Sequence, residues 1–418
     1  MRHATDPVRQ TVIFFLTLAF SATALQAQDA SRGVAMPLTV SGGLLVSQRS
    51  LAGDYDAGKT VPGFRAVLYP GFKINSKWSV QSTIDVHSNP FFYYEAFYDE
   101  KTVESTVEQL FLGYSRNGED SSVGLKVGKL NSAFGSFPLR YSDAVNPLLD
   151  QPFAFAYATK LRPDQYPCGS LDLAHQVTYP VYVDHYCGGA TTEREGMTPV
   201  TLYGLPGAEL NVTWHHVDSR FQWTNSSPSN PQSLRSDSQH LQWTAGAGYT
   251  ILQGFRVGVS GFQGPFLEED VRSLLATGTD ERDYPATAVG TDVQWARGRW
   301  SANGEWQRVE FRYPAFRVPP VVSSGYAEFK ATLNPRIYAA ARAGLESHSR
   351  VEDNGGIVVD RFLPNRQSYE IAVGYRLNRF QTLKVGYEWL KTDGVSGTQN
   401  NVFGVQFVTS VHSLSKSF

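Results

Sequence analysis

The sequence has few sulfur-containing residues and, beyond its first residues, no long apolar run. Its 418 residues include 2 Cys and 3 Met. After residue 27, no stretch of about 18 uninterrupted apolar residues occurs, which is the length that a membrane-spanning helix needs. A helical membrane protein is therefore excluded.

Net charge is also nearly absent. The chain carries 37 Lys and Arg against 39 Asp and Glu, which gives a formal net charge of -2. No basic block or stripe stands out along the sequence, and a nucleic-acid partner would require one. We therefore expect no nucleic-acid partner.

The motifs of common catalytic sites are missing as well. No Gly-x-Ser-x-Gly, no phosphate-binding glycine-rich loop and no metalloprotease helix motif occurs. His215 and His216 are adjacent, and neighbours on a strand point to opposite faces, so they cannot bind one metal together. Asp85 and His87 could share a strand face, but two residues do not make a site. We expect no enzyme activity, no cofactor and no metal.

The two cysteines, Cys168 and Cys187, lack the spacing of a zinc site. In an exported protein such a pair is typical of a disulfide that closes a loop, and we predict this bond. Two independent free thiols are the alternative.

The N-terminus reads as an export signal. Arg2, His3 and Arg9 precede an apolar run from Thr11 to Ala24 that ends in small residues. This pattern predicts a cleaved signal peptide over residues 1–27. The mature chain, residues 28–418, would then lie outside the cytoplasm.

Aromatic residues and glycine are plentiful, with 21 Tyr, 25 Phe, 8 Trp and 37 Gly, and they fall in segments with a period of two. In residues 78–87, Trp, Val, Ser, Ile and Val alternate with Ser, Gln, Thr, Asp and His. One face suits lipid and the other suits water. Such segments predict about 16 strands, which start near residues 38, 63, 78, 105, 122, 208, 219, 240, 255, 286, 299, 324, 337, 367, 381 and 401.

The connections between these segments alternate between tight turns and long polar stretches. Residues 75–77, 116–121 and 297–298 are tight, whereas residues 50–62 and 265–285 are long. A soluble all-β sandwich or propeller is the alternative, but its strands are usually shorter. We predict an all-β fold, a single transmembrane antiparallel β-barrel of about 16 strands with both termini in the periplasm. Its start near residue 38 leaves no room for an N-terminal plug domain.

One connection, residues 132–207, is far longer than the others and contains both cysteines. By its place and the strand count, the chain resembles the 16-stranded outer-membrane porins, whose third outer loop folds inward and narrows the channel. The segment Val127–Gly135 is similar to the strand-end Gly…Phe-Gly motif of the phosphate-selective porin group. The loop has few of that group's basic residues, which argues against phosphate selectivity.

The resemblance implies a bacterial outer-membrane location, a possible homotrimer, and recognition of the last strand and Phe418 by the barrel assembly machinery. It also implies a constriction lined from the loop by Arg140, Asp143, Asn146, Asp150 and Gln151. Wall residues that would line the pore are Lys126, Arg220, Arg256, Lys330, Arg342, Glu328 and Glu370.

The charges predicted to face the lumen are mixed, so they predict weak ion selectivity unless the loop supplies a bias. They are Arg65, Lys73, Lys126, Arg220, Arg256, Lys330, Arg342, Arg376 and Lys384 against Asp85, Glu209, Asp292, Glu305, Glu328, Glu346, Glu370 and Glu388. Many could simply pair across the wall.

The sequence therefore predicts a porin-like channel, embedded in outer-membrane lipid, for passive diffusion of small hydrophilic solutes or ions. The alternative is a barrel plugged by the same loop that binds a ligand or a surface partner. An outer-membrane hydrolase would need a site that the sequence does not show.

Overall fold

In the computed structural model, the described residues are 33–47, 60–89, 102–156, 159, 161–178, 186–189, 196–231, 240–394, 400–411 and 415–417. The predicted signal peptide and Phe418 lie outside these residues. Within the described part of the chain, no helix is long and apolar enough to cross a membrane.

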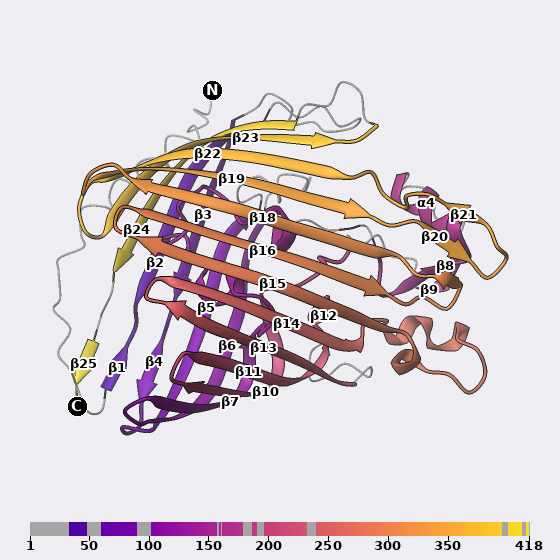
Figure 1. The fold of residues 1–418 in the computed structure, drawn as a ribbon, viewed down its shortest axis with the longest axis horizontal. Helices are drawn as coiled ribbons and strands as arrows, with labels where there is room; N and C mark the ends of the chain where they lie inside the picture. Colours follow the sequence, from indigo (N-terminus) through magenta and orange to yellow (C-terminus); the bar gives the residue numbers. More distant parts are fainter. Residues whose placement is uncertain are drawn as a thin grey trace, which may run out of the picture.

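Sixteen of the described strands form one closed antiparallel barrel (Figure 1). In chain order they are β2 (Leu38–Ser47), β3 (Thr60–Leu68), β5 (Trp78–Asn89), β6 (Thr102–Asn117), β7 (Ser121–Asn131), β10 (Tyr203–Trp214), β11 (Val217–Ser227), β13 (Leu241–Leu252), β14 (Phe255–Pro265), β15 (Pro285–Arg297), β16 (Trp300–Phe311), β18 (Val321–Thr332), β19 (Ile337–His348), β22 (Arg366–Arg376), β23 (Gln381–Thr392) and β24 (Asn400–Val411).

Closure is made by β2, which pairs with β3 on one side and with β24 on the other. Short strands extend this seam at the end of the tight turns: β1 (Gly33–Ala35) pairs with both β4 (Gly71–Lys73) and β25 (Ser415–Ser417). Closing the sheet leaves no unpaired strand edge, which a membrane would not tolerate.

The predicted barrel is confirmed, and the predicted strand starts lie close to the observed ones. The largest difference is at β10, which begins at Tyr203 and not near residue 208. A register shift between Tyr203 and Leu205, a positive φ of 97° at Gly204 and the proline at 206 break the alternation there.

The two faces of the wall differ as the alternation predicted. On the outer face, Trp214, Trp223, Val259 and Val289 are more than half exposed. On the inner face, charged side chains are buried, and Asp85, for example, is 2% exposed. The outer face therefore suits lipid, whereas the inner face is polar.

The long connections gather at one end of the barrel, opposite the tight turns (Figure 1). The connection between β7 and β10 holds α2 (Phe137–Arg140), α3 (Phe153–Ala156), β8 (Gln165–Pro167), α4 (Ser170–Thr178) and β9 (Tyr186–Gly189). Other loops contain β12 (Asn230–Pro231), the 3-10 turns Glu269–Leu274 and Glu281–Asp283, and a small sheet of β17 (Phe316–Val318), β20 (Val351–Asp353) and β21 (Val358–Val359).

Candidate functional site

The connection after β7, here called the third loop (residues 132–202), turns at once onto the inner wall. The backbone N–H of Ala133 donates to the side chain of Gln222 on β11 at 2.9 Å, and that of Gly135 donates to Ser260 on β14 at 3.1 Å. Gly135 has a φ of 71°, and a Cβ there would lie 2.6 Å from a carboxylate oxygen of Glu305. Glycine is therefore required at this turn of the Phe-Gly segment.

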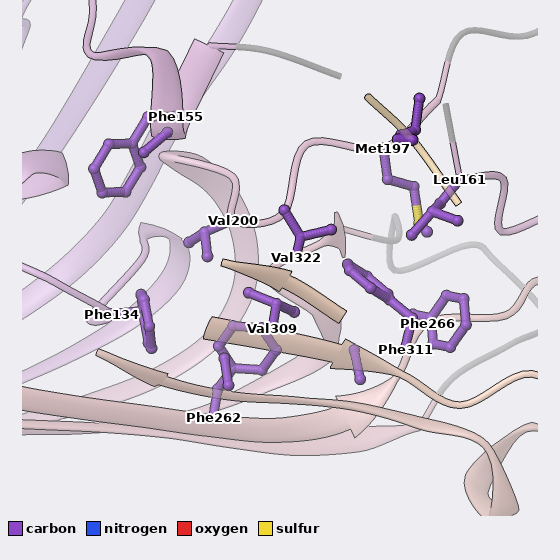
Figure 2. Close-up of a cluster of buried hydrophobic side chains, with 14 of the residues drawn as sticks. Phe134, Phe155, Leu161, Met197, Val200, Phe262, Phe266, Val309, Phe311 and Val322 are labelled. Carbon is purple, nitrogen blue, oxygen red and sulfur yellow. The ribbon is translucent and has the colours of Figure 1, made fainter. Parts of the chain in front are cut away.

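A hydrophobic cluster fixes the loop against one side of the wall (Figure 2). Phe134 from the loop packs edge-on against Phe262 of β14, with ring centroids 5.3 Å apart. Phe137 stacks on Phe155 of α3 at 5.1 Å. All four rings are buried, and full burial of one such side chain contributes about 1.5–3 kcal/mol. The loop is thus packed onto the inner face as part of the core.

The first polar network, here the Arg342 network, holds the loop on β18, β19 and β22. Arg342 forms ion pairs with Glu328 at 2.8 Å and with Glu370 at 3.2 Å. Its guanidinium also donates to the side chain of Asn146 at 3.1 Å and to the backbone carbonyl of Asp150 at 2.9 Å. Five of the residues predicted from the sequence therefore meet in one place.

Two wall residues, Glu370 and Lys384, bind the backbone of the same loop segment. Glu370 accepts a hydrogen bond from the N–H of Leu149 at 2.9 Å. The ammonium group of Lys384 on β23 donates to the carbonyls of Asp143 at 2.7 Å and Leu148 at 3.1 Å. Lys384 is 1% exposed, so loop carbonyls take the place of water around its charge.

The second network, here the Arg65 network, holds Asp143 against β2 and β3. Arg65 forms ion pairs with Asp85 at 2.5 Å, with Glu108 at 3.0 Å and with Asp143 at 3.5 Å. The hydroxyl of Tyr141 donates to Asp143 at 3.0 Å. One buried guanidinium therefore serves three carboxylates.

Arg140 belongs to a third group, on β16 and β18. It donates to the hydroxyl of Tyr326 and lies 4.0 Å from Glu305. Glu305 accepts a hydrogen bond from Ser136 of the loop at 2.6 Å. The loop is therefore attached to wall strands on several sides of the barrel.

The other predicted site residues have separate surroundings. Lys126 and Arg256 form ion pairs within the wall. Lys126 pairs with Glu209 at 2.8 Å, and Arg256 pairs with Asp218 and Asp292. Three predicted site residues remain. Lys330 lies over the ring of Tyr338 at 4.6 Å, and Arg220 donates to the carbonyl of Gly135 at 3.2 Å. Gln151 is half-buried, and its backbone N–H donates to the carboxylate of Asp150 at 2.6 Å.

The inward position of Glu108 was not predicted from the sequence because the alternation breaks at that point. Thr83 of β5 faces Gln109, but the next residue, Ile84, faces Val107, so Glu108 is the extra residue of a β-bulge. Val107 is exposed on the outer face, whereas Glu108 is 6% exposed and reaches Arg65. Two consecutive polar residues between apolar ones, Glu108 and Gln109, were the available signal.

Two neighbouring cavities lie between β5, β6 and the loop. The wider one, of about 610 Å³, is at the end of the tight turns and includes Lys73 and Lys77 in its lining. The narrower one, of about 50 Å³, is lined by Arg65, Glu108 and Asp143. Both share six residues, which are Tyr69, Thr83, Gln109, Asn131, Pro138 and Tyr141. The wide space therefore narrows toward the Arg65 network.

The outer part of the third loop is attached to a different loop. The backbone N–H of Ser170, the first residue of α4, donates to the carboxylate of Asp353 on β20 at 3.1 Å. Hydrogen bonds from backbone N–H groups, that of Ser170 first, hold the pKa of Asp353 below its usual value. Asp353 thus caps α4 from a neighbouring loop.

The cysteine pair is described only in part. β8 and β9 pair antiparallel with Pro167 opposite Tyr186, and Cys168 and Cys187 are the residues that follow these two in the chain. The side chain of Cys187 lies outside the described residues, so the disulfide stays a prediction. Among the described residues, no group of three or more His, Cys, Asp or Glu is arranged to hold a metal ion.

No family model and no curated protein matches the chain by sequence. Solved structures do match its fold. OmpT, an outer membrane protein of Vibrio cholerae, is 12% identical, covers 93% of this chain and 100% of its own, and has a TM-score of 0.53. The outer membrane channel DcaP of Acinetobacter baumannii is 9% identical with the same coverage and a TM-score of 0.53. An anion-selective porin from Comamonas acidovorans is 11% identical, covers 91% and 99%, and has a TM-score of 0.52. The fold is that of the outer-membrane porins.

Proposed function

We propose that this protein is an outer-membrane channel for passive diffusion of small hydrophilic solutes or ions, narrowed by its third loop. The observation that carries the proposal is the position of residues 143–150. Side chains on β3, β19, β22 and β23 bind this segment along the inner wall of the barrel, through Arg65, Arg342, Glu370 and Lys384. A polar wall with a loop fixed against it is what a restricted aqueous pore requires.

The remaining features fit an exported membrane protein. We propose that residues 1–27 are a signal peptide and that residues 28–418 form the barrel, with the third loop (residues 132–202) narrowing it. We also propose that the barrel assembly machinery recognises the last strand with Phe418. The exposed apolar outer face would contact outer-membrane lipid. A homotrimer and a Cys168–Cys187 disulfide belong to the same proposal.

Conductance in a planar bilayer tests the proposal. The signal-free protein, refolded and inserted, should give discrete current steps, and a variant lacking residues 140–195 should give larger ones. This deletion removes both the segment bound by Lys384 and the cysteines. Steps of equal size with and without the loop would contradict a constriction at this position.

A plugged barrel that binds a ligand or a surface partner is the second candidate, and the hydrophobic cluster favours it. Three loop residues, Leu161, Met197 and Val200, are fully or almost fully buried. They belong to one cluster with Phe266, which follows β14, and Phe311, the last residue of β16 (Figure 2). Apolar packing of this kind can seal a lumen. No current from the complete protein, with current from the loop-deleted variant, would establish this second function.

A further inference from the structure

The two cavities beside β5 and β6 bear on where ions would cross the proposed channel and on whether cations or anions would be preferred. We infer that ions cross between β6 and loop residues 138–143, and that this neck passes cations in preference to anions because Glu108 and Asp143 outnumber Arg65. This inference rests on the proposed function.

The path follows from where the loop is attached. Hydrogen bonds fix the loop on the sides of β2, β3, β11, β14, β16, β18, β19, β22 and β23. On the side of β5 and β6, a cavity of about 610 Å³ separates the loop from the wall instead. It adjoins the smaller cavity of about 50 Å³, where Arg65 lies between Glu108 at 3.0 Å and Asp143 at 3.5 Å.

The sign follows from the charges at the narrow end. Arg65 carries one positive charge and pairs with three carboxylates, those of Asp85, Glu108 and Asp143, so the four groups together keep two negative charges in excess. Lys384 is a further nearby cation, but its ammonium group donates to the carbonyl of Asp143 and does not line the neck. Among the described residues of this network, three carboxylates still face two cations when Lys384 is counted together with Arg65.

The lysines of the wide cavity do not reverse this sign. Lys73 and Lys77 are exposed at its mouth. Exposed charges are screened over about 8 Å at physiological salt, whereas charges at a narrow, buried point act at close range. The groups around Arg65 therefore decide which ions pass.

An unpaired oxygen at the same place supports a positively charged or donating solute. The side-chain oxygen of Asn131, which lines both cavities, is buried and accepts no hydrogen bond from any described residue. Its amide nitrogen donates to the carbonyl of Pro138 at 3.3 Å. The partial negative charge of this oxygen, which no described donor offsets, adds to the attraction for cations in the adjoining space.

The bulge in β6 is what brings the negative charge of Glu108 into the neck. In a regular strand, Glu108 and Gln109 would point to opposite faces, and only one would reach the lumen. The bulge turns both inward, where Gln109 donates to Thr83 at 3.4 Å and Glu108 reaches Arg65. A carboxylate thereby stands in the neck without any change in the lipid-facing pattern of Val107 and Leu110.

Reversal potentials in a potassium chloride gradient at pH 8 test the inference, with the complete protein, Glu108→Gln, and Glu119→Gln as the matched control. Glu119 is exposed in the turn that follows the same strand. The complete protein should favour potassium over chloride. Glu108→Gln should lower that permeability ratio about fivefold at low salt, the effect of one unit charge about 4 Å away in water, and Glu119→Gln should not change it.

A second variant tests the path separately from the charge. Thr83→Phe would fill the space shared by the two cavities and should cut single-channel conductance by more than half. Heat-modifiable migration on a gel would show that each variant is folded. Anion preference, or an unchanged ratio in Glu108→Gln, would overturn the inference while leaving a channel, and so would an unchanged conductance in folded Thr83→Phe. Absence of any current would instead refute the proposed function.

Discussion

Replacing Lys384 with Met should release the middle of the third loop from the wall. The ammonium group of Lys384 donates to the carbonyls of Asp143 at 2.7 Å and Leu148 at 3.1 Å. Met fills a similar volume but donates nothing, so both carbonyls would be left without this donor in the docked loop. A buried acceptor without a donor costs about 1–3 kcal/mol, which gives about 2–6 kcal/mol for the pair.

This cost favours the undocked loop, where water would reach both carbonyls. The lower value, about 2 kcal/mol, corresponds to an increase of about thirtyfold in the undocked population. Hydrogen–deuterium exchange in detergent micelles measures it directly. The amide of Leu149, which donates to Glu370 in the docked loop, should exchange at least about thirtyfold faster in Lys384→Met.

Lys330→Met is the matched control for the loss of a wall lysine. Lys330 lies on the inner side of β18, and its described contact is with the ring of Tyr338. Exchange of the Leu149 amide should therefore stay as in the unchanged protein. If Lys384→Met also leaves that exchange unchanged, the wall does not hold the loop through Lys384, and the reasoning from these contacts is wrong.

Three other perturbations follow from the same contacts. A Cβ on Gly386 would lie 2.9 Å from both the Leu149 side chain and the backbone carbonyl of Ile371, so Gly386→Val should strain the wall, displace the loop, cost about 1–3 kcal/mol and raise single-channel conductance. Because the pKa of Asp353 is lowered in the folded protein, the stabilising effect of its carboxylate is present above pH 4 and lost as the pH falls through that lowered pKa. Asp353→Asn should therefore speed hydrogen exchange of the Ser170 amide at pH 7. Lowering the pH of the unchanged protein from 7 to 5 should not release this contact. If the predicted disulfide forms, exposed Cys168 should react with maleimide only after reduction, as mass spectrometry would show.

Much of the wall was predictable from the sequence because each strand of a β-barrel is specified by residues that are close together in the chain. Each strand must present apolar residues to lipid and polar residues to water, so residues 78–87 reveal both the strand and its orientation. The turns add a second local signal, since tight connections such as residues 297–298 can only join adjacent antiparallel strands. Strand number and closure follow from such segments, one at a time.

The attachment of the loop could not be predicted in this way. Arg342 and Glu370 could be predicted to face inward, but not that they bind Asn146 and the backbone at Leu149, because these contacts join residues about 200 positions apart. The inward position of Glu108 could not be predicted either, because a bulge, and not the alternation, turns its side chain inward.

The sequence by itself determined the strands, their faces and the existence of a long third connection, since each depends on neighbouring residues. Only the tertiary structure decided where that connection lies, because its position depends on which inner-wall groups meet it after the barrel closes. Arg65 illustrates the difference. Its inward position follows from alternation on one strand, whereas its pairing with Asp85, Glu108 and Asp143 exists only once β3, β5, β6 and the loop are side by side.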